Sequence, residues 1–166
     1  MIIASMSRST GTWGLKKSPS GRIAKKKSKR IPMLDPKLLS HFQKDTYINL
    51  IGATMEAVEP GYCRVSIRVS ESMLNFHGTT HGGIVFGIAD IAFAAACNSH
   101  GQVAVALSMD IHYLNASNAG DELVAEAKEV SRSASTALYD ITVTERTGQK
   151  VIAKLHAMAY RKRQEI

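Results

Sequence analysis

The chain has 166 residues, of which 45% are hydrophobic and 21% are charged, a composition that suits one globular domain with a packed core. Its formal net charge of +7 comes from residues 1–34, which hold nine Lys or Arg and no acid. Residues 35–166 hold 12 basic and 14 acidic side chains, so they offer no basic surface for nucleic acid. No apolar stretch approaches the roughly 20 residues that a membrane span needs.

Residues 1–34 are rich in Ser, Gly, Lys and Arg and have no hydrophobic period, which predicts a disordered tail before a folded domain over 35–166. Three interpretations of this tail stay open. It is basic and acid-free like a transit peptide, and residues 25–30 suit weak binding to nucleic acid or an anionic membrane. We favour an upstream extension with Met33 as the natural start, because the tail lacks an amphipathic helix and an apolar signal core.

The sequence of residues 35–166 predicts helices and strands in a definite order. Asp35 as N-cap before Pro36 predicts a short helix to about Lys44. Alternating apolar residues predict two strands, a loop and, after one long helix, four more strands; in the first of these, alternate residues from Val103 to Tyr113 are assigned to one face. The long helix is apolar around most of its circumference and must be buried, so we expect an α+β fold with an antiparallel sheet curled over it. The expected strands are 53–59, 62–69, 102–114, 121–131, 135–145 and 149–161, with the loop over 70–80 and the long helix over about 82–98.

The two cysteines, Cys63 and Cys97, match no metal-ligand spacing and are predicted to be reduced and buried. Nothing in their pattern indicates an oxidising compartment. We therefore expect a cytoplasmic protein that holds no metal.

The segment from Asn75 to Asp90 carries the residues best suited to chemistry. Gly82 and Gly83 open the long helix, where the first amides lack an internal acceptor and lie at the positive end of the helix dipole. Such amides can hold a substrate carbonyl oxygen as it becomes an oxyanion, and His81 and Asn75 flank this point. The alternative is a glycine-rich helix entry with histidines packed nearby.

Asp90 lies in the middle of the long helix among apolar neighbours. An unpaired carboxylate there costs several kcal/mol, and no Lys or Arg occurs between Arg68 and Lys128 to offset that cost. Either Asp90 makes a structural hydrogen bond to another helix, or it is a catalytic base or nucleophile with a perturbed pKa.

The spacing of Gly82 and Asp90 constrains any shared site. They are eight residues apart, roughly 12 Å along a helix at about 1.5 Å per residue, which is too far for both to reach one carbonyl from the same chain. A two-fold dimer with antiparallel central helices would pair Gly82 of one chain with Asp90 of the other.

Residues 75–98, with His-Gly-Gly and then Ile-Ala-Asp-Ile-Ala-Phe-Ala-Ala-Ala-Cys-Asn-Ser, resemble the phenylacetate-degradation (PaaI) branch of the hotdog thioesterases. The likeness extends through Ala119-Gly120-Asp121 and Tyr139-Asp140-Ile141 to about Tyr160. The resemblance implies a hotdog fold, a homodimer or a homotetramer built as a dimer of dimers, and metal-free hydrolysis of acyl-CoA to free acid and CoA. It also implies an aryl-acetyl or medium-size acyl group, and no cofactor beyond the coenzyme A of the substrate.

The resemblance assigns roles by motif. Asp90 would be the catalytic nucleophile or general base, Gly82 the oxyanion amide, and Asn75 and His81 the groups that polarise the carbonyl or orient water. Certain members of the family place a serine on the strand after the helix, where this chain has Ala106; Ser108 is assigned to the same strand face as its substitute. The remaining substrate-binding candidates are His77, Gly83, Tyr113 and the turn Ser131-Arg132-Ser133-Ala134-Ser135-Thr136, whose hydroxyls and guanidinium suit the phosphates of CoA.

Two other functions fit the same fold. A hotdog dehydratase pairs a histidine with a carboxylate, but in a different motif from the His-Gly-Gly and Asp spacing found here. The other is a non-catalytic acyl-CoA-binding or regulatory protein. Such a regulator would need a DNA-binding module, and residues 1–34 cannot form a helix-turn-helix, although a basic disordered tail is compatible with weak, salt-sensitive binding to nucleic acid.

Overall fold

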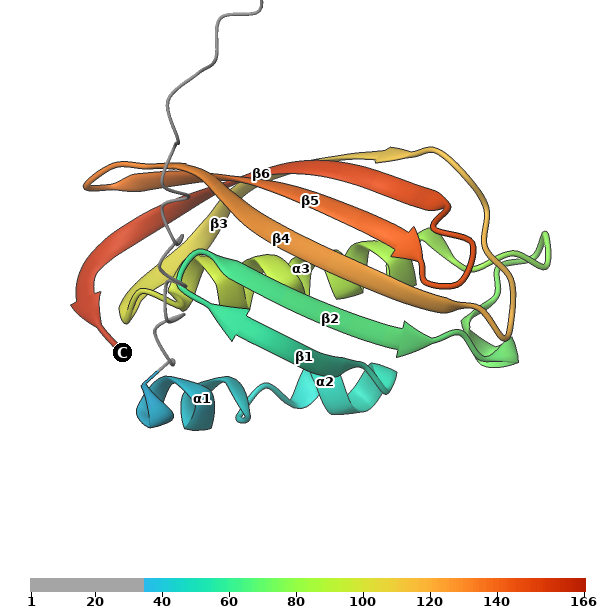
Figure 1. The fold of residues 1–166 in the computed structure, drawn as a ribbon, viewed down its shortest axis with the longest axis horizontal. Helices are drawn as coiled ribbons and strands as arrows, with labels where there is room; N and C mark the ends of the chain where they lie inside the picture. Colours follow the sequence, from blue (N-terminus) through green and yellow to red (C-terminus); the bar gives the residue numbers. More distant parts are fainter. Residues whose placement is uncertain (1–34) are drawn as a thin grey trace, which may run out of the picture. The chain divides into compact units, whose positions relative to one another are not determined.

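The structure is a computed structural model that describes residues 35–166. The predictions about residues 1–34 lie outside the described residues. Within the described part, helices α1 and α2 precede two strands, a short 3-10 turn η1 precedes the long helix α3, and four strands follow (Figure 1). The bounds are α1 Pro36–Phe42, α2 Thr46–Ile51, β1 Thr54–Glu59, β2 Tyr62–Arg68, η1 Glu71–Met73, α3 Gly82–Asn98, β3 Gln102–Tyr113, β4 Glu122–Arg132, β5 Thr136–Glu145 and β6 Val151–Glu165.

The strands form one antiparallel sheet in the order β1-β2-β4-β5-β6-β3, and Figure 1 shows this sheet wrapped around α3. The α+β fold predicted from the sequence is confirmed. Because β3 comes directly after α3 yet lies at the edge beside β6, one long side of β3 has no strand partner within the described chain.

The first helix is shorter than predicted, and a second helix follows it. Asp35 caps α1 by accepting a hydrogen bond from the Lys37 amide at 2.9 Å. Asp45 caps α2 in the same way through the Tyr47 amide at 2.9 Å, and Gly52 ends α2 with a left-handed φ of 70°. Helix α2 was not predicted from the sequence, and it places Tyr47 against Gly87 of α3.

Helix α3 is buried almost all round, as its composition predicts. Ile88, Ala89 and Ala92 are fully buried, and Phe93 meets the buried Tyr139 of β5 edge-on at 5.4 Å between ring centroids. One stripe is open, because Gly83 and Ala94 are exposed and Asp90 between them is half-buried. Residues spaced by three and four positions share a helix face, so this stripe runs along one side of α3.

The prediction that alternate residues from Val103 to Tyr113 share one face of β3 was wrong, because β3 contains a bulge. Ala106 pairs with Ala159 of β6 and Ser108 pairs with Met158, which leaves Leu107 as the extra residue. Ala159 is fully buried whereas Met158 is 40% exposed. Directly paired residues lie on the same face, so Ala106 and Ser108 face opposite sides of the sheet.

Cys63 and Cys97 are buried free thiols, as predicted. Burial raises the pKa of each thiol to about 12. A protonated, buried thiol is unreactive, so neither cysteine is a candidate nucleophile.

Candidate active site

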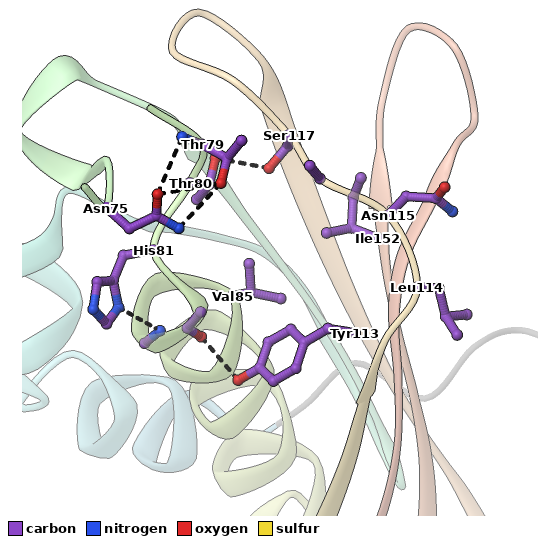
Figure 2. Close-up of a pocket in the computed structure, with 13 residues that line it drawn as sticks. Asn75, Thr79, Thr80, His81, Val85, Tyr113, Leu114, Asn115, Ser117 and Ile152 are labelled. Atoms are coloured by element: carbon purple, nitrogen blue, oxygen red, sulfur yellow. Dashed lines mark hydrogen bonds between the residues drawn. The ribbon is translucent and has the colours of Figure 1, made fainter. Parts of the chain in front are cut away.

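His81 caps the start of α3 and thereby fixes its own tautomer. Its Nδ1 accepts a hydrogen bond from the Gly83 amide at 2.9 Å, as Figure 2 shows. A neutral ring whose Nδ1 is an acceptor carries its proton on Nε2. His81 therefore presents an Nε2–H donor at the entry to the helix.

The first amides of α3 have different partners. The amide of Gly83 is engaged by the His81 ring, and those of Ile84 and Val85 donate to the His81 carbonyl at 2.9 and 3.4 Å. The Gly82 amide has no acceptor within residues 35–166. Gly82 is thus the one free donor of this helix start among the described residues, and a developing oxyanion would be stabilised there.

A cavity of about 560 Å³ opens in front of this helix start (Figure 2). The Tyr113 hydroxyl donates to the Gly82 carbonyl at 3.1 Å, and its ring lies 3.2 Å from where a Cβ on Gly82 would stand. A side chain at position 82 would therefore displace Tyr113. The cavity is lined by Asn75, Thr79, Thr80, His81, Gly82, Gly83, Val85, Tyr113, Leu114, Asn115, Ala116, Ser117 and Ile152.

Asn75 organises the loop that leads into the helix. Its Oδ1 accepts from the His77 amide at 2.9 Å and from the Thr79 amide at 3.3 Å, while its Nδ2 donates to Thr79 Oγ1 at 3.0 Å. The side chain is therefore largely committed to the loop, with one Nδ2 hydrogen left for a ligand.

Asp90 lies outside this cavity, eight residues further along α3 and so roughly 12 Å away. Its carboxylate makes no hydrogen bond or ion pair with another residue of the described chain. Burial, and next the nearby charge of Asp45 at the start of α2, raise the pKa of Asp90 above its ordinary value. An unpaired carboxyl with a raised pKa is typical of a functional group.

The other predicted substrate-binding residues are spread over the fold. His77 is exposed beside Phe76, with ring centroids 4.1 Å apart. Ser108 lies on the opposite sheet face from Ala106, so the prediction that the two residues share a strand face was wrong. Of the candidates, the cavity brings together Asn75, His81, Gly82, Gly83 and Tyr113.

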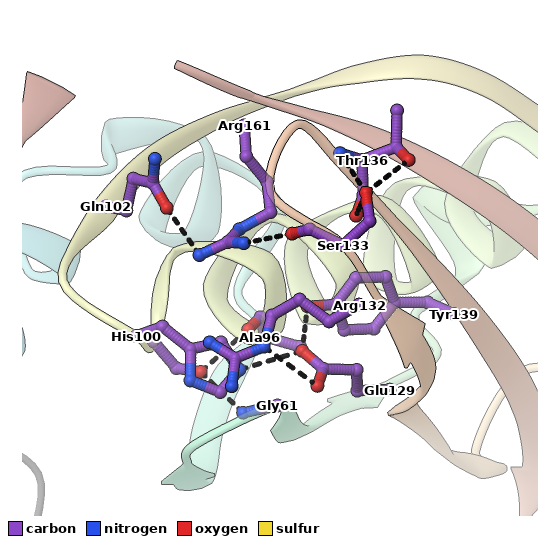
Figure 3. Close-up of polar contacts among 11 residues, drawn as sticks. Gly61, Ala96, His100, Gln102, Glu129, Arg132, Ser133, Thr136, Tyr139 and Arg161 are labelled. Atoms are coloured by element: carbon purple, nitrogen blue, oxygen red, sulfur yellow. Dashed lines mark hydrogen bonds and ion pairs between the residues drawn. The ribbon is translucent and has the colours of Figure 1, made fainter. Parts of the chain in front are cut away.

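The turn between β4 and β5 lies away from the cavity and is tied down by internal contacts (Figure 3). Ser133 Oγ accepts from the Thr136 amide at 3.0 Å, and the Arg161 guanidinium donates to the Ser133 carbonyl. Arg132 Nε lies 3.3 Å from Glu129 Oε1. Despite these contacts, residues 131–135 are all exposed.

Sequence reasoning missed three contributors. Thr80 and Ser117 join the cavity through a buried hydroxyl pair at 2.7 Å, and no spacing rule connects residues so far apart. Tyr47 lies against α3 from the unpredicted helix α2. The sequence contained a signal for helix α2, because Asp45 and Gly52 flank the segment as an N-cap and a C-terminal glycine.

Comparison with known proteins agrees with this geometry. A family described as the thioesterase superfamily matches residues 77–152. A putative esterase of Archaeoglobus fulgidus is 39% identical over 120 residues, which cover 72% of this chain and 77% of that protein. The acyl-coenzyme A thioesterase PaaI of Escherichia coli is 35% identical over 120 residues, 72% of this chain and 85% of that enzyme. The chain belongs to the thioesterase superfamily.

The same assignment follows from three-dimensional structure. The Escherichia coli PaaI protein from the phenylacetic acid degradation operon matches this thioesterase with a TM-score of 0.76 and 33% identity, over 81% of this chain and 99% of that one. The hotdog fold and the PaaI-like resemblance predicted from the sequence are confirmed, and the protein is a thioester hydrolase.

No helix in residues 35–166 is long and apolar enough to cross a membrane. No group of three or more His, Cys, Asp or Glu side chains in residues 35–166 is arranged to hold a metal ion.

Proposed function

We propose that this thioesterase hydrolyses acyl-CoA, with an aryl-acetyl or medium-size acyl group, to the free acid and CoA. The proposal rests on two polar groups of α3 that have no hydrogen-bond partner within residues 35–166. They are the Gly82 amide, which lies beside a cavity, and the Asp90 carboxylate. The first suits an oxyanion and the second suits a base or nucleophile.

We propose further that the active enzyme is at least a homodimer formed through β3. This edge strand exposes Val105, Leu107 and Tyr113 and has one unpaired side, a combination that favours association. Pairing of β3 with its copy about a two-fold axis would lay the two α3 helices antiparallel, with their open stripes facing each other. A homotetramer would be a dimer of such dimers.

In such a dimer each site combines two chains. Asp90 removes a proton from water as the water oxygen attacks the thioester carbonyl carbon, and Gly82 of the partner subunit donates its amide to the resulting oxyanion. The Nε2–H of His81 of the partner subunit would support the same oxygen. The C–S bond then breaks, and the proton held by Asp90 passes to the departing CoA sulfur. The same placement would serve direct attack by the Asp90 carboxylate, followed by hydrolysis of the anhydride.

A cavity one helical turn beyond Asp90 offers room for the acyl group. This cavity of about 390 Å³ lies between α1, β3 and the second half of α3, where the exposed Ala94 stands one turn after Asp90 and the buried Ala95 is next to it. Phe42 and Met55 add apolar surface. An aromatic or medium-size acyl group fits the chemistry of this lining.

The nucleotide end of CoA is assigned to the turn of residues 131–136. The exposed hydroxyls of Ser131 and Ser135 are available to phosphate oxygens, and Arg132 adds positive charge at the surface. The name of the Escherichia coli relative, an acyl-coenzyme A thioesterase, supports CoA as the thiol half of the substrate.

The test is release of free thiol from a panel of phenylacetyl-, hexanoyl- and acetyl-CoA. We expect turnover to be highest for phenylacetyl- or hexanoyl-CoA, and Asp90→Ala to lower kcat by roughly 100- to 10,000-fold. Unchanged turnover in Asp90→Ala would remove Asp90 from the mechanism. Tight binding of every CoA ester without thiol release would instead indicate a non-catalytic acyl-CoA-binding protein.

A further inference from the structure

Helix α2 places a tyrosine directly against α3, one turn before Asp90. A Cβ built on Gly87 would lie 2.9 Å from the Tyr47 hydroxyl oxygen and 3.5 Å from Cε1 of its ring. Gly87 is buried, so the phenol end of Tyr47 occupies the space that a side chain at position 87 would fill. The glycine therefore permits the close approach of Tyr47 to the helix.

Tyr47 is held by its backbone while its hydroxyl is free. The Tyr47 amide donates to the N-cap carboxylate of Asp45 at 2.9 Å, which fixes the start of α2. The hydroxyl makes no hydrogen bond to any residue in the described range 35–166, although it lies against a buried stretch of helix. Because Tyr47 is 42% exposed, its unpaired hydroxyl is free to bind a water molecule.

Helix geometry places Asp90 on the same face of α3 as Gly87. Positions 87 and 90 are neighbours on one helix face, with Cβ atoms about 5–6 Å apart. Side chains on a helix lean toward its N-terminus, so the carboxylate of Asp90 covers the turn that contains Gly87. The Tyr47 hydroxyl and the Asp90 side chain are thus placed over the same turn of α3, and no direct hydrogen bond joins them.

We propose that Tyr47 and Asp90 of one subunit hold the attacking water between them. The carboxylate accepts one hydrogen of the water and the phenol oxygen accepts the other, which leaves a lone pair of the water free to face the thioester carbonyl. On attack the new C–O bond forms, one proton moves to Asp90, and Tyr47 keeps its own proton throughout. This inference rests on the proposed role of Asp90 as the base.

The decisive variant is Tyr47→Phe, which keeps the ring against Gly87 and removes only the hydroxyl. The bond between the water and the phenol joins two neutral groups, so we expect kcat to fall roughly 3- to 10-fold, with KM within about twofold of wild type. Tyr62→Phe is the matched control, because it removes a phenol that donates to Glu126 at 2.6 Å outside the proposed site, and its kcat should equal that of wild type.

Steady-state kinetics with phenylacetyl-CoA and thermal unfolding of each variant give the answer. A wild-type kcat in Tyr47→Phe, a loss confined to KM, or a lowered Tm that accounts for the lost activity would each overturn the inference. If Asp90→Ala is inactive while Tyr47→Phe turns over normally, only the role of Tyr47 fails. If Asp90→Ala keeps its turnover, the proposed function fails first.

Discussion

The two ends of α3 carry polar groups that are used in opposite ways. After its C-terminal end, His100 Nε2 lies 2.7 Å from Glu129 Oε2, and the Tyr139 hydroxyl donates to the same oxygen at 2.9 Å (Figure 3). At the N-terminal end the Gly82 amide is unpaired, as is the carboxylate of Asp90 half-way along. Polar groups that are hydrogen-bonded within the chain stabilise the fold, whereas polar groups without a partner remain available to a substrate.

Glu129 and Asp90 show that partners, more than burial, decide the state of a carboxyl. Burial raises the pKa of Glu129, but hydrogen bonds from His100 and Tyr139 and the charges around it outweigh burial, so its pKa lies below the ordinary value. Burial raises the pKa of Asp90 too, and the charge of Asp45 adds to the effect. Within the described chain no hydrogen-bond donor or positive charge lowers the pKa of Asp90 in return.

The largest effect is expected from Asp90→Asn, which replaces the unpaired carboxylate by a neutral group of the same shape. We expect kcat to fall roughly 100- to 10,000-fold, measured as thiol release. Because the folded-state pKa of Asp90 is raised, ionisation of this group destabilises the fold above that pKa. The variant should therefore have a higher Tm than wild type at pH 7, and the gain should vanish below about pH 4. A lower Tm at pH 7 would show that Asp90 is a structural residue.

A smaller loss of kcat is expected from variants of His81 that distinguish the roles of its two ring nitrogens. His81→Asn keeps an acceptor for the Gly83 amide but lacks the Nε2 donor, whereas His81→Ala loses both. We expect both variants to lose roughly 10- to 100-fold in kcat, and only the alanine variant to lose about 1 kcal/mol of unfolding free energy. Chemical denaturation beside the kinetic assay tests this. Equal stability of the two variants would refute the capping role.

The smallest effect on catalysis is expected at the satisfied cluster. Glu129→Gln should leave kcat within about twofold of wild type but lower the Tm at pH 7, because the amide cannot hold His100 and Arg132 as a carboxylate does. A carboxyl whose folded-state pKa is lowered stabilises the fold above its unfolded pKa and stops doing so as the pH falls. The difference in Tm from wild type should thus shrink below about pH 4.5. A large loss of kcat with an unchanged Tm would assign the cluster to catalysis.

Much of the fold followed from the sequence alone. The apolar circumference from Gly82 to Asn98 predicted the bounds of α3, and alternation predicted every strand within a few residues. Two features did not follow. The bulge at Leu107 depends on pairing with β6, which local alternation does not reveal, and it reversed the face of Ser108. Helix α2 was missed because its β-branched residues favour strands, although Asp45 caps it.

The candidate site was predictable in kind but not in detail. A glycine pair before a buried helix predicted an anion-binding start, and a lone aspartate among apolar residues predicted a functional carboxyl. The sequence did not show that the Gly83 amide donates to the His81 ring while the Gly82 amide stays unpaired, because this depends on the rotamer of His81. It also did not place Tyr47 beside Gly87, since that contact comes from a separate helix.

The central claim is that each active site takes Asp90 from one subunit and the His81–Gly82 helix start from the other. It is tested most directly by purifying, with two affinity tags, mixed dimers of Asp90→Asn and His81→Asn chains. Such a dimer contains one intact shared site and one doubly altered site. The account therefore predicts about half of wild-type activity per dimer, although each variant alone keeps at most about a tenth of it. Activity no greater than the mean of the two single variants would contradict it and place the whole site within one chain.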